Sequence, residues 1–171
     1  MDPILFSIFS GIAAILFAVW LIFKIYSYPS GDEKMVEIAK AIQIGAKTYL
    51  NRQYKTITVV AVGAAILIGY FINITTMVGF IVGAIASGLA GYIGMSVSVR
   101  ANVRSAEAAK SSIAKAFDVA FRGGSVTGLL VVGMALLSVA GFYAATKDVM
   151  ALIGLGLGGS LISVFARLGG G

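Results

Sequence analysis

The sequence predicts an all-α transmembrane protein, a bundle of five membrane-spanning helices. The first observation is composition: of 171 residues, 59% are hydrophobic and only 12% are charged. Soluble domains carry about a quarter charged residues, so this chain has too little charge to cover a water-soluble surface. The second observation is that the charges are spaced far apart, leaving uncharged stretches as long as the roughly 20 apolar residues of a spanning helix. We therefore expect an integral, multi-pass protein of the cell membrane.

The first two uncharged stretches predict three spans. Residues 3–27 form the first, which is too long and too aromatic at its end for a cleaved signal peptide. The second stretch, Thr56–Val99, is too long for one helix and fits two, at residues 56–73 and 77–99. The short polar turn Asn73-Ile74-Thr75-Thr76 would join them.

The remaining spans and the orientation follow from the later charges. Residues 123–146 and 149–168 form the fourth and fifth spans. Of the 13 Lys and Arg residues, 11 lie in the connections 28–55 and 100–122 or, in the case of Lys24, just before the first of them. Because basic residues are retained on the cytoplasmic side, we expect both connections in the cytoplasm and the N-terminus outside.

Both connections have helix-forming sequences. Ser30 and Glu33 have the spacing of a capping box, so we expect a helix that starts near Asp32 and continues into the second span. The Ala-rich segment Ser105–Phe121 is also a good helix former. Long helices would therefore extend from the membrane into the cytoplasm. The alternative for either segment is a short amphipathic helix lying on lipid headgroups.

Small residues indicate close helix contacts. Gly79, Gly83, Ser87 and Gly91 recur every four residues, which predicts a packing stripe on one face of the third span. The run Gly154–Gly159 has the spacing of a dinucleotide-binding loop. It lies inside an apolar span without a preceding strand, and so it favours helix packing over phosphate binding.

Several charged positions are candidates for specific interactions. Arg100 and Arg104 place like charges on one helix face, so we expect an anionic lipid or an internal partner, with a substrate phosphate as the alternative. Asp118 and Arg122 can pair across one helical turn. Arg167 follows 18 uncharged residues and has no carboxylate in the chain obviously placed to pair with it. An ionisable group inside a membrane is by default a candidate functional residue.

The composition also limits the chemistry. The chain has no Cys and no His, which excludes disulfides, thiolate sites and histidine bases or ligands. Its seven carboxylates are scattered, so we predict no catalytic residue and no metal site within these residues. The net charge of +6 is explained by membrane orientation, and we expect no nucleic-acid partner.

Four stretches follow one another from one end of the chain to the other: Gly45–Lys55, Gly94-Met95 leading to Arg100–Arg104, Ala120–Val126, and Phe165–Gly171. In this order and at this spacing they resemble the membrane-bound, ion-pumping inorganic pyrophosphatases. The resemblance implies a fold of about sixteen spans, each of membrane-crossing length, of which these five are the first. It places the first four helices in an outer ring and the fifth in an inner ring.

The resemblance also implies a function. Such proteins are homodimers that hydrolyse magnesium pyrophosphate while moving protons or sodium ions across the membrane. Mg²⁺ is the implied cofactor, and activation by K⁺ is left open. Arg167 matches an arginine of the ion gate, which pairs with an acidic residue of the following helix.

The chain ends just before the acidic signature that binds magnesium pyrophosphate in this family. We therefore expect these 171 residues alone to be inactive. The alternative is a self-contained five-span transporter subunit or membrane assembly protein without catalytic activity.

Overall fold

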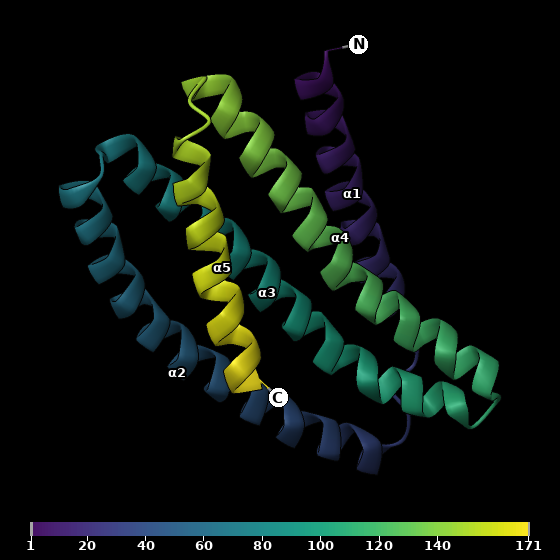
Figure 1. The fold of residues 1–171 in the computed structure, drawn as a ribbon. Coiled ribbons are helices and arrows are strands. Elements are labelled where there is room, and N and C mark those ends of the chain that lie inside the picture. Colours follow the sequence, from purple (N-terminus) through teal and green to yellow (C-terminus); the bar gives the residue numbers. More distant parts are fainter. Residues whose placement is uncertain (1, 171) are drawn as a thin grey trace.

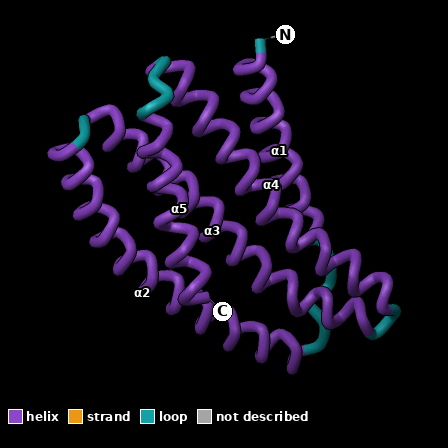
Figure 2. Tube along the Cα trace, in the orientation of Figure 1, coloured by secondary structure: helices purple, strands orange, loops and turns teal. Residues whose placement is uncertain are grey.

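The computed structural model describes the backbone of residues 2–170 and the side chains of residues 2–165. The backbone forms α1 (Pro3–Tyr26), α2 (Glu33–Phe71), α3 (Ile74–Ala109), α4 (Ile113–Thr146) and α5 (Ala151–Gly170). No strand occurs within this part of the chain, and short loops connect the helices (Figure 2). The fold class is all-α, as the sequence predicts.

Polar side chains fix where the first four helices begin. Asp2, followed by Pro3 in the first turn, accepts a hydrogen bond from the backbone N–H of Ile4 at 2.9 Å. Asp32, Asn73 and Ser112 do the same for α2, α3 and α4. Each caps a backbone N–H that has no partner inside the helix.

The predicted start of α2 near Asp32 is confirmed, but one capping residue and two boundaries differ from the sequence-based prediction. Asp32, not Ser30, is the N-cap of α2, because its carboxylate accepts from the Met35 N–H at 2.9 Å. The predicted turn of residues 73–76 is shorter, since Asn73 caps α3 and the helix begins at the next residue. The segment 105–121 is interrupted at residues 110–112, where Ser112 accepts from the Lys115 N–H at 3.2 Å and starts α4.

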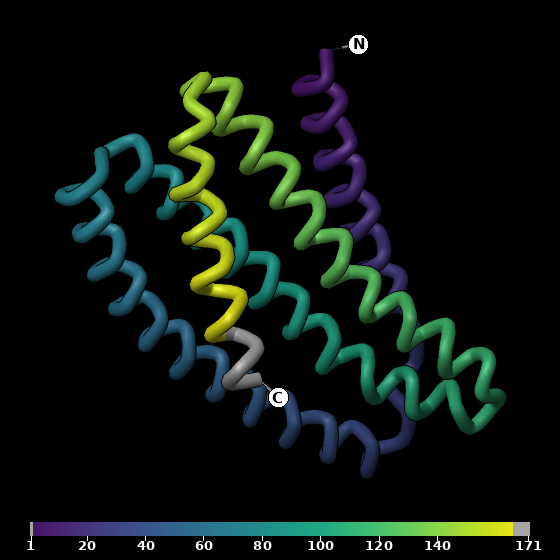
Figure 3. The backbone as a smooth tube through the Cα atoms, in the orientation of Figure 1, coloured from purple at the N-terminus to yellow at the C-terminus, as the bar shows by residue number. Residues whose placement is uncertain are grey.

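The helices run up and down in a bundle, with α3 in contact with all four others (Figures 1 and 3). α1 packs on α4, while α2 and α5 pack on α3. A buried core joins three helices: Ala18, Leu21 and Ile25 of α1, Ala90, Val97 and Ala101 of α3, and Val126 and Leu130 of α4. The end of α1, the start of α2, the end of α3 and the start of α4 meet at one end of the bundle, which we call the junction.

The outer faces of the bundle are apolar. Within the described chain, α1 to α4 are long and apolar enough to cross a membrane, and Ala151–Phe165 of α5 forms a shorter apolar helix. Large side chains on these faces are open, with Phe23 71% and Tyr70 83% exposed. A surface of this kind suits lipid or other helices, so the protein is an integral, multi-pass membrane protein.

Glycines bring α3 and α5 together at backbone distance. A Cβ atom at Gly79 would lie 2.6 Å from the Ala151 carbonyl oxygen, and one at Gly83 would overlap the Leu155 carbonyl. Ser87, the next residue of this stripe, donates from its hydroxyl to the Gly159 carbonyl at 3.1 Å. The predicted packing stripe is present, and α5 is its neighbour for these three residues.

Candidate functional site at the helix junction

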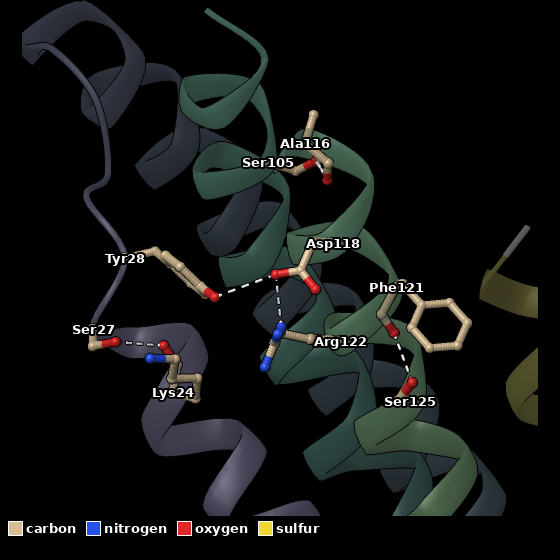
Figure 4. A network of polar contacts seen from close by, with 9 residues as sticks. All are labelled: Lys24, Ser27, Tyr28, Ser105, Ala116, Asp118, Phe121, Arg122 and Ser125. Atoms are coloured by element: carbon tan, nitrogen blue, oxygen red, sulfur yellow. Dashed lines mark hydrogen bonds and ion pairs between the residues drawn. The ribbon is translucent and has the colours of Figure 1, made fainter. Parts of the chain in front are cut away.

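The junction holds a polar cluster that links α1 to α4. Asp118 on α4 accepts a hydrogen bond at 2.8 Å from the Nε of Arg122, one turn further along the helix. The same carboxylate oxygen accepts from the Tyr28 hydroxyl at 3.4 Å, and Tyr28 lies just beyond the end of α1 (Figure 4). One carboxylate therefore joins the α1–α2 loop to the first turns of α4.

Arg104 connects α3 to this cluster. Its Nε donates to the Tyr28 carbonyl at 3.2 Å, and its guanidinium lies 5.5 Å from the centroid of the Tyr26 ring. Its NH1 donates to the Arg100 carbonyl at 2.7 Å. Arg104 thus has internal partners, as one of the sequence-based alternatives predicts, although these are carbonyls and a ring.

A second ion cluster lies at the outer edge of the junction. Lys110 Nζ lies 3.0 Å from an oxygen of Asp32 and 2.7 Å from an oxygen of Glu107. Asp32 also caps α2, so Lys110 ties the start of α2 to the end of α3. Both Lys110 and Asp32 are more than half exposed, so water screens this pair strongly.

The contacts at the junction shift the acidity of its groups. The hydrogen bond from Arg122 is the main cause that lowers the pKa of Asp118 below its usual value of 3.8. The Met35 N–H, followed by Lys110, lowers the pKa of Asp32. The pKa of Lys110 is raised, first by Glu107 and then by Asp32. All these shifts favour the charged forms, so the groups are held as ion pairs near neutral pH.

This arrangement fastens helices together and does not form a metal site. Magnesium prefers several clustered carboxylate oxygens. In residues 2–165, no three acidic side chains lie together as possible metal ligands. Three carboxylates of the junction, Asp32, Glu107 and Asp118, are instead engaged with basic side chains.

Arg167, the predicted gate residue, falls within the bounds of α5, but its side chain lies outside the described residues. The neighbouring turn of α5 contacts α2. There the Gln53 side-chain amide donates to the Phe165 carbonyl at 3.0 Å. Gln53 belongs to the first of the four family-like stretches and Phe165 to the last, so the fold brings the two stretches together.

The spacing of four residues predicts the Asp118–Arg122 pair but does not indicate its further partner, Tyr28. Tyr28 lies 90 residues away from Asp118, and no local pattern connects them. The Lys110–Asp32 pair spans 78 residues and is hidden in the same way. Neither pairing has a sequence signal, because each depends on how α1 and α2 dock on the α3–α4 hairpin.

Comparison with known proteins gives one consistent result. The family model described as inorganic H⁺ pyrophosphatase matches residues 12–171. The chain is similar to the K(+)-insensitive pyrophosphate-energized proton pump of Methanosarcina mazei, at 47% identity over 95% of this chain and 24% of that protein. It is also similar to the corresponding pump 2 of Moorella thermoacetica, at 43% identity over 94% of this chain and 25% of that protein.

A third relative is the putative K(+)-stimulated pyrophosphate-energized sodium pump of Clostridium tetani. It is 41% identical over 98% of this chain and 25% of that protein. The chain therefore spans about a quarter of the length of the curated relatives it matches.

Proposed function

Because the chain belongs to the inorganic H⁺ pyrophosphatase family, we propose that it is the N-terminal part of a membrane pump that couples magnesium pyrophosphate hydrolysis to transport of protons or sodium ions. The observation that carries this proposal is the match over residues 12–171 together with relatives named as pyrophosphate-energized pumps. Those relatives include a proton pump and a putative sodium pump, so the proposal covers both ions.

In this proposal the five helices act as a scaffold for the pump. The family resemblance assigns α1 to α4 to an outer ring and α5 to an inner ring. The contact of α3 with every other helix, and its glycine contact with α5, support a rigid unit of this kind. A homodimer follows from the resemblance and stays a prediction.

The chemistry of hydrolysis is not assigned to residues of this chain. Mg²⁺ would be supplied with the substrate and would offset the charge of pyrophosphate. The acidic side chains within residues 2–165 do not fit such a site, because no three of them meet. We therefore place the hydrolytic residues elsewhere in the pump and expect these 171 residues alone to be inactive.

The test is ion transport by the full-length gene product in inverted membrane vesicles. We expect pyrophosphate and Mg²⁺ together to drive proton uptake, followed by quenching of a pH-sensitive dye, or uptake of radioactive sodium. The 171-residue chain alone, purified in detergent, is the matched control and should release no phosphate. Sustained Mg²⁺-dependent phosphate release by that control would overturn the scaffold proposal. Absence of transport by the full-length product would overturn the proposal that the protein is part of a pump.

We further propose that Arg167 couples hydrolysis to transport by pairing with an acidic group in another helix of the pump. In the full-length protein, Arg167→Ala should lower transport on the order of tenfold, because it leaves a buried charge without its partner. The amount of folded protein in the membrane, measured by fluorescence size exclusion, should change much less. Arg167→Lys is the control that keeps the charge. Normal pumping by Arg167→Ala would show that this residue is only an interfacial anchor.

A further inference from the structure

A groove runs along the hairpin of α2 and α3 and has two chemically different parts. The first part is a cavity of about 560 Å³ lined mainly by apolar side chains of α2 and α3 and, among the described side chains of α5, by Ile162. The second is a cavity of about 390 Å³ between the junction halves of α2 and α3. Tyr92 lines both cavities, so the two parts meet at this residue.

The apolar part lies within the span. It extends along α3 from Met77 to Tyr92 and is lined on α2 by residues such as Ala61 and Ala65. At 1.5 Å per residue this length of α3 is about 22 Å, more than the roughly 15 Å of hydrocarbon in one leaflet. The cavity is therefore long enough to hold an acyl chain along its full length.

The other part is basic. Lys40 and Lys47 of α2 and Arg100 of α3 line it, and no carboxylate is among its described lining residues. None of the ion pairs among the described side chains involves these three residues. Arg100 donates one hydrogen bond, to the Ser96 carbonyl of its own helix at 2.9 Å, and its side chain is otherwise exposed.

Two tyrosines mark the boundary between the parts. The rings of Tyr54 and Tyr92 meet edge to face, with centroids 5.6 Å apart. The Tyr54 hydroxyl donates to the Gly88 carbonyl at 2.8 Å, which holds the pair across the two helices. Tyrosine is enriched where hydrocarbon gives way to headgroups, so the pair places the basic cavity at headgroup level.

We propose that this groove binds an anionic phospholipid of the junction-side leaflet. One acyl chain lies in the apolar cavity, and the phosphate is bound by Lys47 and Arg100, with Lys40 further out. The charge pattern favours a lipid over a helix as the ligand of the groove. A helix packed on the basic part would need carboxylates of its own to neutralise the three basic side chains, whereas an anionic headgroup already carries the negative charge. Basic pockets between spanning helices at this depth are typical of anionic headgroup sites.

Native mass spectrometry of the pump, released from membranes in a mild detergent, tests the headgroup. The probes are palmitoyl-oleoyl phosphatidylglycerol, which is anionic, and the matching phosphatidylcholine. We expect the unmodified protein to prefer phosphatidylglycerol. The double variant Lys47→Gln/Arg100→Gln should bind phosphatidylglycerol on the order of thirtyfold more weakly, because each basic residue near the membrane surface contributes to the attraction of an anionic headgroup. Lys34→Gln/Lys115→Gln removes two exposed charges from the same side, outside the groove, and should keep the preference.

A second pair of variants tests the acyl chain. Ala61→Phe should fill the apolar cavity and lower binding of both lipids, whereas Val59→Phe, at a 74% exposed position that does not line the cavity, should leave it unchanged. Size exclusion and circular dichroism check that each variant is folded. If Ala61→Phe does not fold, the charge variants decide alone. The proposal is overturned if the unmodified protein binds the two lipids equally. It is also overturned if Lys47→Gln/Arg100→Gln binds phosphatidylglycerol as well as the unmodified protein does. Either result is expected if another helix of the pump fills the groove.

Discussion

At the scale of single residues, Asp118 connects parts of the chain that are far apart in sequence. Its carboxylate accepts from Arg122 on its own helix and from Tyr28 beyond α1. The Asp118 side chain is 48% exposed, so water screens its contacts and they add little to the stability of the protein. Their main effect is to fix the position of the α1–α2 loop. A local change here should therefore loosen the loop without unfolding the bundle.

We predict that Asp118→Asn lowers the hydrogen-exchange protection of residues 27–32 by about twofold near neutral pH. The pKa of Asp118 is lowered in the folded protein, so the ionised carboxylate stabilises the loop at any pH above the ordinary carboxyl pKa. This stabilisation is lost as the pH falls through the lowered pKa of Asp118 in the folded protein. Protection in the unmodified protein should thus be constant from pH 7 to pH 5 and fall only below about pH 4, with a smaller fall in the variant.

The matched control is Glu37→Gln, which removes an exposed carboxylate of α2 that takes part in none of the described ion pairs. Hydrogen–deuterium exchange with mass spectrometry, expressed as protection factors, gives the measurement. Equal protection in Asp118→Asn and the control would show that the Tyr28 contact does not hold the loop.

At the scale of helices, glycines determine how closely α3 and α5 approach. The pattern is reciprocal, because a Cβ at Gly154 would overlap the Thr76 carbonyl and one at Gly158 would overlap the Phe80 carbonyl. Lipid offers no hydrophobic drive between helices, so close backbone packing is a main source of their attraction. Gly156, on the other hand, meets nothing within 4 Å.

We predict that Gly158→Ala destabilises the protein by about 1–3 kcal/mol, since the added methyl group must push α5 away from α3. Gly156→Ala is the control in the same helix and should be neutral or stabilising by up to about 1 kcal/mol, because alanine favours helix. Thermal unfolding in detergent, followed by circular dichroism, compares the two. A Gly158→Ala melting temperature equal to that of the control would mean that the helices do not approach this closely.

The helices were predictable from the sequence, while their ends and contacts were less so. Uncharged stretches identified the apolar helices because water and hydrocarbon impose opposite demands on side chains. The break at residues 110–112 was missed because the alanines around it favour helix, although Ser112 carried an N-cap signal. The motif-like run near Gly154 packs through Gly154 and Gly158, a spacing of four that reflects helix geometry and not phosphate binding.

At the scale of the whole molecule, charge is distributed unevenly along the bundle. The two connections that carry most Lys and Arg residues form the junction end, where α2, α3 and α4 extend past the apolar spans. Lys147 stands at the opposite end, between α4 and α5. We infer from the positive-inside rule that the junction faces the cytoplasm and the N-terminus faces outside.

Single cysteines test this orientation directly, because the chain has none of its own. In intact cells, a membrane-impermeant maleimide should label Thr75→Cys, at the exposed start of α3, and should label Ser111→Cys only after the cells are permeabilised. The protein without an introduced cysteine is the control for background labelling. The reverse pattern of labelling would mean that the basic connections lie outside.

The unbroken course of α2 has a mechanical consequence. Its 39 residues form one helix about 58 Å long, which begins at the junction and ends at the far side of the span. Because no loop interrupts these residues, a change in the distance between the two ends requires the helix itself to bend or unwind. The junction and the far side of the span are thereby joined by one continuous, curved helix, with no loop between them (Figure 1).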